Sequence, residues 1–244
     1  MHGTTRTAVL ALVLAALIPA SASAAALPPA SPPGTVRLSD EKTTTKWAHT
    51  ADLQPVFSRP SGSARRVAHL RLLTEDGFAE VYVVLASWKS PAGNTWLKIR
   101  VPKRPNGLTG WVRESALSQL HTVHTLVRIN KHTLRVTLYE RGKKRFSARI
   151  GVGKASTPTP AGHFWIREKF RVGGHTLYGP RAIGTSAYAP YLTDWPGGGV
   201  VGMHGTNQPE LVPGRPSHGC IRLHNSDILR LYQMASVGTP IDIV

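Results

Sequence analysis

Cysteine is nearly absent from this chain of 244 residues, because Cys220 is its only example. A single thiol cannot form an intramolecular disulfide, so a fold held by such bonds is excluded. Acidic residues are also scarce: 13 Asp and Glu stand against 30 Lys and Arg, which gives a formal net charge of +17. A charge of this size favours polyanionic partners but does not specify a fold.

An apolar run long enough to cross a membrane is also missing at the N-terminus. The run over residues 8–18 falls short of the roughly 20 residues that a spanning helix needs. It follows Arg6 and precedes small residues over 22–26, which is typical of a cleaved secretory signal peptide. We therefore predict a signal peptide over 1–26, secretion into the cell envelope and no stable membrane span in the mature protein. An uncleaved anchor is the alternative.

Patterns typical of nucleic-acid binding are missing too. The sequence shows no zinc-finger spacing, no basic helix and no basic sheet studded with aromatic residues. For an exported protein, the expected polyanions are instead the carboxylates of wall peptides and the phosphates of wall polymers. We expect anionic wall polymers, and no nucleic acid, among the partners.

The first half of the chain carries short strand signals. A proline-rich spacer is expected over 27–46, and the folded part is expected to begin at residue 47. Residues 79–85 alternate with a period of two, Asp76-Gly77 before them is a turn candidate, and a loop rich in Pro and Gly follows over 102–110. Short strands separated by turns predict a small barrel.

Three stretches of this half have a recognisable pattern: PVFSRP at 55–60, TWLKI at 95–99 and GWV at 110–112. They resemble bacterial SH3-like domains, which are commonly wall-targeting modules. The resemblance implies an SH3-like small barrel over 47–120 that associates with the wall. We expect the tryptophans of these stretches in its core, because large aromatic side chains dominate small cores.

The second half, residues 122–244, also begins with strands. Leu134, Val136 and Leu138 would share one face of a strand, and a turn at 141–143 predicts a hairpin. Further on, a short helix capped by Asn225 or Ser226 and a last strand are expected.

The segment 171–199 is broken by many glycines and prolines, so we predict no long element there. A long irregular loop in a compact domain is often functional, and this one is expected to form a rim or lid over a cleft.

Cys220 lies in the sequence SHGCIR at 217–222, sixteen residues after His204. A cysteine attacks as its thiolate, and an imidazole nearby can accept the thiol proton and later return it. His204 and His218 both qualify, and their spacing does not choose between them. Gly219 would let the backbone amides of residues 219 and 220 point at an oxyanion.

Two other roles for the thiol stay open from the residues alone. A lone cysteine can be an inert buried residue. Alternatively, it could join a zinc site whose other ligands would be His204, His218 and His224, although this spacing matches no familiar structural zinc pattern. We expect no metal and no cofactor.

Two longer motifs surround these residues: GMHGTN at 202–207 and RPSHGCIRL at 215–223. Together they resemble the signature of the L,D-transpeptidases, the YkuD-like family. GVG at 151–153 and TPTPAG at 157–162 add to the resemblance, although the family's loop is commonly a shorter Thr-Pro-x-Gly. The resemblance covers about residues 123–244.

The resemblance implies a mostly β protein, with a sandwich-like catalytic domain over 122–244 that carries one short helix. Cys220 would be the nucleophile and His204 the group that accepts and donates the proton. Arg222 would order the site or contact the substrate, and Tyr188 and Tyr191 would line the cleft. The environment of the thiolate and the oxyanion would be formed by Gly205, Ser217, His218 and Gly219.

The implied substrate is the tetrapeptide stem of peptidoglycan. Cys220 would attack the carbonyl of the third residue and expel the terminal D-alanine, and an amine of a second stem would resolve the thioester into a cross-link between third residues. Two alternatives remain: an L,D-carboxypeptidase that uses water as the acceptor, and a non-catalytic wall-binding protein.

Overall fold

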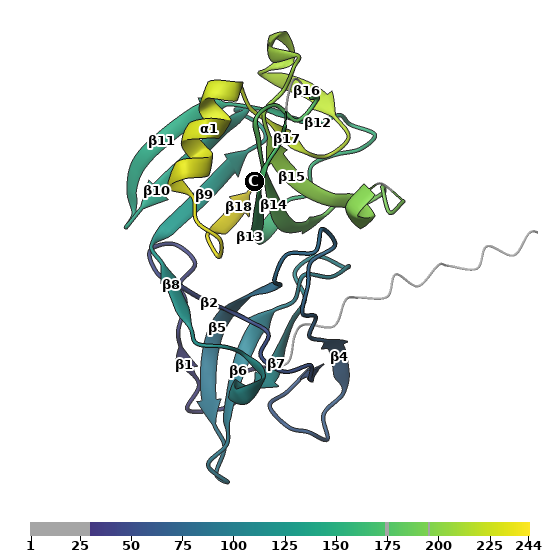
Figure 1. The fold of residues 1–244 in the computed structure, drawn as a ribbon. Coiled ribbons are helices and arrows are strands. Elements are labelled where there is room, and N and C mark those ends of the chain that lie inside the picture. Colours follow the sequence, from purple (N-terminus) through teal and green to yellow (C-terminus); the bar gives the residue numbers. More distant parts are fainter. Residues whose placement is uncertain (1–29, 174–175, 195) are drawn as a thin grey trace, which may run out of the picture.

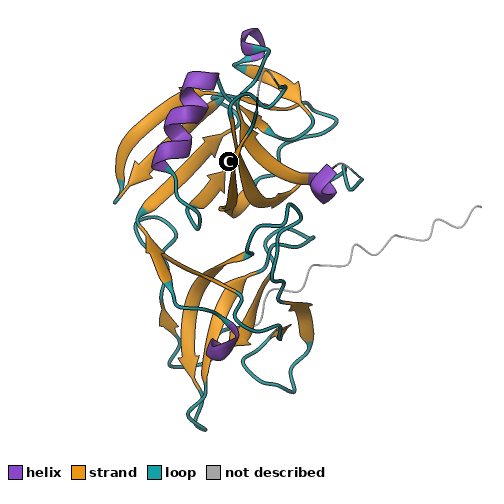
Figure 2. Ribbon diagram, in the orientation of Figure 1, coloured by secondary structure: helices purple, strands orange, loops and turns teal. Residues whose placement is uncertain are grey.

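The chain folds into two lobes that are stacked end to end (Figure 1). The computed structural model describes residues 30–173, 176–194 and 196–244, so the predicted signal peptide over 1–26 lies outside the described residues. Strands dominate both lobes, and α1 (Asn225–Met234) is the one α-helix of the described ranges (Figure 2). In these ranges no helix has the length and apolar character that crossing a bilayer requires.

The first lobe is an antiparallel sheet in the order β4-β3-β7-β6-β5-β2-β8, with β1 added to β5. The side chains of one strand, β5, alternate between two apolar clusters. Tyr82 and Val84 lie in the core of this lobe, while Val81 and Val83 face the second lobe. Trp96 and Trp111 are buried together, as expected. The strands are β1 (Val36–Arg37), β2 (Thr45–His49), β3 (Pro55–Phe57), β4 (Arg66–His69), β5 (Val81–Lys89), β6 (Thr95–Arg100), β7 (Thr109–Arg113) and β8 (His121–Val123).

Part of the predicted spacer belongs to this sheet. β1 pairs with β5, and the indole of Trp88 donates a hydrogen bond to the carbonyl of Pro33 at 3.1 Å. At the other end, β8 pairs with β2. The sheet therefore uses residues 36–123, a longer span than the prediction of 47–120.

The second lobe is a sheet in the order β11-β10-β9-β18-β13-β14-β15-β17-β12-β16. It curves around an apolar core to which α1 adds Ile228 and Leu231. The strands are β9 (Thr125–Asn130), β10 (Arg135–Glu140), β11 (Lys143–Arg149), β12 (Gly151–Gly153), β13 (Gly162–Arg171), β14 (Arg181–Tyr188), β15 (Val200–His204), β16 (Gly214–Ser217), β17 (Ile221–Arg222) and β18 (Pro240–Ile243).

The hairpin predicted at the start of this lobe is confirmed. β10 and β11 pair in an antiparallel manner, and Val136 and Leu138 are buried on one face. The turn uses Arg141 and Gly142, whose φ angles of 49° and 76° lie in the left-handed region. Two consecutive residues of this kind are typical of a type I′ hairpin turn.

Two local predictions were wrong. Residues 171–199 contain β14, which pairs with β13 and β15 in the middle of the sheet, because the glycines and prolines are concentrated on both sides of the alternating sequence at 181–188. The residue before α1 is His224, which makes no side-chain cap, and Asn225 instead accepts a hydrogen bond from the Thr206 amide at 2.9 Å.

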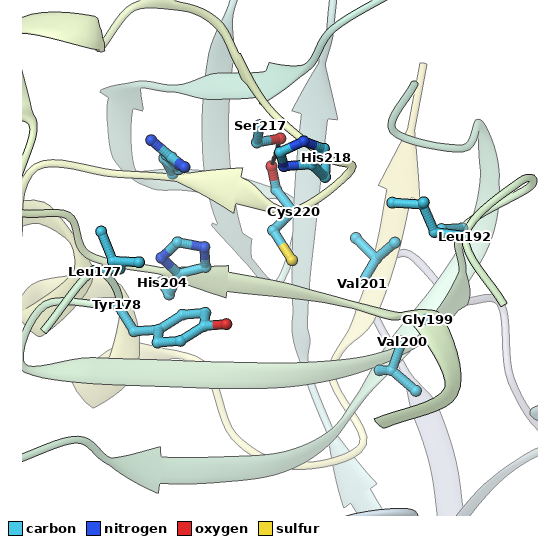
Figure 3. A pocket seen from close by; sticks show the side chains of 12 residues that line it. Leu177, Tyr178, Leu192, Gly199, Val200, Val201, His204, Ser217, His218 and Cys220 are labelled. Carbon is cyan, nitrogen blue, oxygen red and sulfur yellow. Dashed lines mark hydrogen bonds between the residues drawn. The ribbon is translucent and has the colours of Figure 1, made fainter. Parts of the chain in front are cut away.

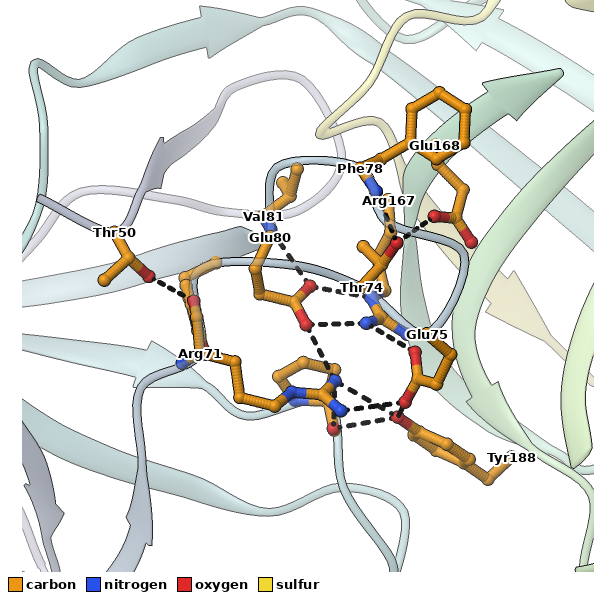
Figure 4. A network of polar contacts seen from close by, with 12 residues as sticks. Thr50, Arg71, Thr74, Glu75, Phe78, Glu80, Val81, Arg167, Glu168 and Tyr188 are labelled. Atoms are coloured by element: carbon orange, nitrogen blue, oxygen red, sulfur yellow. Dashed lines mark hydrogen bonds and ion pairs between the residues drawn. The ribbon is translucent and has the colours of Figure 1, made fainter. Parts of the chain in front are cut away.

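A buried polar network joins the two lobes (Figure 4). The guanidinium of Arg167 on β13 contacts Glu80 at 2.6 Å and Glu75 at 2.9 Å, and the side chains of Arg167 and Glu80 are fully buried. The indole of Trp165 also donates to the Val81 carbonyl at 2.8 Å. These contacts fix the first lobe against β13 in the middle of the second lobe's sheet.

Candidate active site

Strand pairing brings Cys220 and His204 together. β15 and β17 are parallel neighbours, with His204 opposite Arg222, so Cys220, which directly precedes β17, lies beside the middle of β15 (Figure 3). The Gly202 amide on β15 donates to the sulfur of Cys220 at 3.4 Å. Both side chains line one cavity of about 200 Å³. No hydrogen bond joins them in the described part of the chain.

The turn before Cys220 is held by its own side chains. The Ser217 hydroxyl donates to the Cys220 carbonyl at 2.6 Å and accepts from the Gly219 amide at 3.1 Å. The Gly219 carbonyl in turn accepts from Thr159 at 2.7 Å. Gly219 has a φ of 128°, which L side chains rarely adopt, so a glycine is needed here.

This turn changes one expectation about the oxyanion. The Gly219 amide already donates to Ser217, so it is not directed at a substrate in this structure. Of the two amides that the sequence suggested, that of Cys220 is the better candidate for the developing negative charge.

His204 is oriented by the backbone next to it. Its Nδ1 atom lies 2.6 Å from the Gly205 carbonyl, and because a carbonyl can only accept, Nδ1 carries the proton and Nε2 has the free lone pair. A side chain at position 205 would not fit, since its Cβ would stand 2.3 Å from Oδ1 of Asn225. His204 is therefore set up as a proton acceptor through Nε2.

Burial keeps both reacting groups neutral in the free site. Burial, together with a smaller contribution from the positive charge of Arg222, lowers the pKa of His204 to about 4, against the hydrogen bond to Gly205. Burial also raises the pKa of the Cys220 thiol, although the Gly202 amide and Arg222 act in the opposite direction. Formation of a thiolate in this site would therefore require a proton acceptor, and Nε2 of His204 is the candidate.

Of the other predicted residues, His218 and Arg222 line the cavity with Ser217. Arg222 donates to the Gln208 side chain at 3.1 Å, while its Nε is buried without a hydrogen-bond partner among the described residues. Because Arg222 lines the cavity, its guanidinium could bind a carboxylate or carbonyl of a ligand there.

The two predicted cleft tyrosines are placed elsewhere. Tyr188 is buried between the lobes, where its hydroxyl contacts Glu75, so it does not line the cavity of Cys220. Tyr191 is 71% exposed and is not part of the cavity wall either. The sequence analysis missed Tyr178, whose ring meets that of His204 edge to face at 4.9 Å. Its irregular segment gave no periodic signal that could have identified it.

The second lobe is similar to known proteins. Residues 124–243 match the family model of the L,D-transpeptidase catalytic domain, YkuD. The Bacillus subtilis protein YkuD, which is named as an L,D-transpeptidase, is 36% identical over 120 residues, and the match covers 49% of this chain and 65% of that protein. The Escherichia coli protein YbiS, named likewise, is 29% identical over 144 residues, with 50% and 45% covered.

Among solved structures, a mutant of the Enterococcus faecium L,D-transpeptidase shares 28% sequence identity, covers 49% of each chain and has a TM-score of 0.39. At this TM-score, the structural similarity does not establish a common fold. The chain spans less than two thirds of the length of the two curated relatives. Both motifs that surround Cys220 and His204 lie inside the matched residues.

Proposed function

We propose that the second lobe, which matches the L,D-transpeptidase catalytic domain over residues 124–243, cross-links cell-wall peptides through a thioester on Cys220. The observation that carries this proposal is that a half-buried thiol shares one cavity with an imidazole whose Nε2 is free to accept its proton. Neither a metal nor a cofactor takes part in the proposed reaction.

In the first step, the sulfur of Cys220 attacks the carbonyl carbon of the third residue of a tetrapeptide stem. Nε2 of His204 takes the thiol proton and then gives it to the nitrogen of the departing D-alanine, so that the C–N bond breaks and a thioester remains. The Cys220 amide would stabilise the oxyanion of the tetrahedral intermediate.

In the second step, an amine of another stem attacks the thioester. The new C–N bond forms, the C–S bond breaks, and the sulfur of Cys220 regains its proton from the amine by way of His204. The product is a peptide cross-link between two third residues. With water as the acceptor, the same thioester would give an L,D-carboxypeptidase, which is the second candidate function.

The location of the protein belongs to the same proposal. The substrate lies outside the cytoplasmic membrane, and the signal-peptide pattern over 1–26 together with the net charge of +17 supports export to the anionic wall. The first lobe would then act as an SH3-like, wall-associated domain. If wall binding by the first lobe were the protein's only function, the protein would be a wall-binding protein without catalytic activity.

Intact mass spectrometry tests the proposal. The mature protein is incubated with a disaccharide-tetrapeptide, and we expect a mass gain equal to the stem minus D-alanine in the wild type and none in Cys220→Ala. The products then separate the two reactions, because a cross-linked dimer indicates transfer and a free tripeptide indicates hydrolysis. A folded wild type that gains no mass with several stem types would refute both and favour the wall-binding protein.

A further inference from the structure

We propose that the carboxylates of Asp76 and Glu168 form a binding site for the amine of the acceptor stem, so that the first lobe supplies part of the acceptor site. This inference rests on the proposed transferase function. It concerns a second cavity, of about 450 Å³, that reaches the reactive cysteine over a different part of the sheet.

The second cavity shares the reacting groups with the first. Both are lined by Tyr178, Val200, His204 and Cys220. The first cavity continues past the 217–220 turn, whereas the second continues over β13, β14 and β15 toward Glu168. A reaction that joins two stems at one sulfur needs two approaches of this kind.

A row of residues across neighbouring strands connects Glu168 with Cys220. Glu168 on β13 pairs with Gly184 on β14, Gly184 pairs with Gly202 on β15, and the Gly202 amide contacts the sulfur. Both intervening residues are glycines, so neither adds a side chain between the carboxylate and the thiol. The Glu168 carboxylate leans over this gap, since a Cβ on Gly184 would stand 2.4 Å from its Oε1. Neighbouring strands lie about 4.8 Å apart, so the carboxylate is about one strand spacing from Gly202.

The carboxylate is buried and only half satisfied. Glu168 is 2% exposed, and its Oε2 accepts from the Thr74 hydroxyl, but its Oε1 has no hydrogen-bond donor within residues 30–173, 176–194 and 196–244. A buried acceptor without a donor is costly, and a ligand with N–H groups would satisfy it.

The first lobe brings a second carboxylate to the same cavity. Residues 73–79 form a tight hairpin, closed by the bond from the Thr74 amide to the Phe78 carbonyl at 2.7 Å, with Asp76 at its tip. The hairpin is fixed to β13 by the bond between Thr74 and Glu168, which Figure 4 shows, and by the rings of Phe78 and Phe170 at 5.0 Å. Asp76 lines the cavity as a result.

The charge of this pair fits an amine. Burial raises the pKa of Glu168 to about 7, with opposing contributions from Thr74 and Arg167, and the negative charge of Asp76 raises it further. A cation placed between the two carboxylates would reverse that effect. Arg171 also lines the cavity, but it is exposed to solvent, and Arg167 is engaged by Glu75 and Glu80.

The site also agrees with the chemistry of the second step. A primary amine is protonated at neutral pH and must lose a proton before it attacks. In the proposed step, one proton moves from the ammonium nitrogen to Oε1 of Glu168, and the neutral amine then forms the C–N bond as the C–S bond to Cys220 breaks. The second proton leaves the nitrogen by way of His204 and returns to the sulfur.

The test compares two nucleophiles on the same thioester. The full chain is acylated with a disaccharide-tetrapeptide, a disaccharide-tripeptide with a free amine is added as the acceptor, and both cross-linking and hydrolysis are measured. For Glu168→Gln we expect the acceptor KM to rise by about tenfold or more, since truncating one partner of a buried charge pair costs at least that much. We expect a smaller rise for Asp76→Asn, because Asp76 is exposed.

Two readouts should stay within about twofold of the wild type: the rate at which Cys220 is acylated, and the rate at which water, an uncharged nucleophile, resolves the thioester. Glu140→Gln is the matched control, since it removes an exposed carboxylate that pairs with Arg145 outside this cavity. It should leave every readout unchanged.

The outcomes separate this inference from the proposed function. If the wild type forms cross-links and both variants keep its acceptor KM, the carboxylates only fasten the two lobes together and the inference is wrong. A parallel loss of acylation, hydrolysis and transfer would also overturn it, because that pattern indicates a structural role. A wild type that is never acylated would refute the proposed function itself, and the acceptor site with it. Asp76→Asn keeps the test decisive if Glu168→Gln does not fold.

Discussion

The two buried polar clusters of this protein stabilise their groups in opposite ways. Between the lobes, Arg167 and Glu80 form an ion pair without any exposure to solvent. In the candidate active site, His204 is buried and Cys220 is half-buried, and desolvation favours the uncharged form of both. Low dielectric surroundings penalise every charge, so a charge persists only where a partner compensates for it.

The pKa values show the same difference. Burial alone would raise the pKa of Glu75, but the Tyr188 hydroxyl and the guanidinium groups of Arg167 and Arg71 lower it to about 2. The one charged neighbour that shifts both His204 and Cys220 is Arg222, which favours the thiolate but disfavours the imidazolium. The interlobe cluster therefore pairs its charges in the free protein, whereas the Cys220–His204 pair would become charged only in the proposed reaction.

Removal of the central cation should have the largest effect. Arg167→Met leaves the buried carboxylate of Glu80 without its main partner, and breaking a buried pair in this way typically costs about 3–5 kcal/mol of stability. Chemical denaturation would measure the loss in the free energy of unfolding. The matched control is Arg145→Met, whose pair with Glu140 is about half exposed, and it should cost less than about 1 kcal/mol. Equal losses in the two variants would show that burial does not distinguish the pairs.

The pH profile of acylation tests the neutral pair. Because His204 must be unprotonated to accept the thiol proton, we expect the acylation rate of Cys220 to hold down to about pH 5 and to fall as the pH drops through the His204 pKa of about 4. Each further pH unit below that value should reduce the rate about tenfold. A midpoint near 6.5, the ordinary value for histidine, would show that burial does not set the pKa of His204. Stopped-flow or quenched mass spectrometry over a pH series gives the profile.

The sequence predicted local elements better than contacts between distant segments. The hairpin at β10 and β11 followed from alternation and turn residues, whereas the pairing of His204 with Cys220 was implied by the resemblance of the two motifs that contain them. Tyr188 was misplaced because its partners Glu75 and Asn106 are far away in sequence, in the other lobe. The periodicity of a single segment cannot predict a contact between two distant segments. For the same reason, the sequence analysis did not predict that Asp76 lies near Cys220 and His204.

A smaller effect is expected from the backbone that orients His204. In Gly205→Ala, the new Cβ would meet Asn225 Oδ1 at 2.3 Å and the Pro180 ring at 3.1 Å, so the carbonyl that accepts from Nδ1 must shift. We expect the acylation rate to fall about tenfold while the free energy of unfolding changes by less than about 2 kcal/mol. Gly62→Ala is a suitable control, because nothing lies within 4 Å of the added atom. An unchanged rate would show that this hydrogen bond does not position the imidazole.

The last effect concerns Glu168, which is intermediate between the two clusters because it is buried with one partner and one unsatisfied oxygen. Its pKa is raised from 4.5 to about 7, so the folded protein holds this proton more tightly than the unfolded chain does. The resulting stability is fully present below about pH 4.5 and is lost as the pH rises to about 7. The free energy of unfolding of the wild type should therefore decline over this window relative to that of Glu168→Gln, which does not titrate. Denaturation of both proteins at several pH values measures the difference, and two parallel curves would show that Glu168 is already ionised at low pH and belongs with the paired interlobe charges.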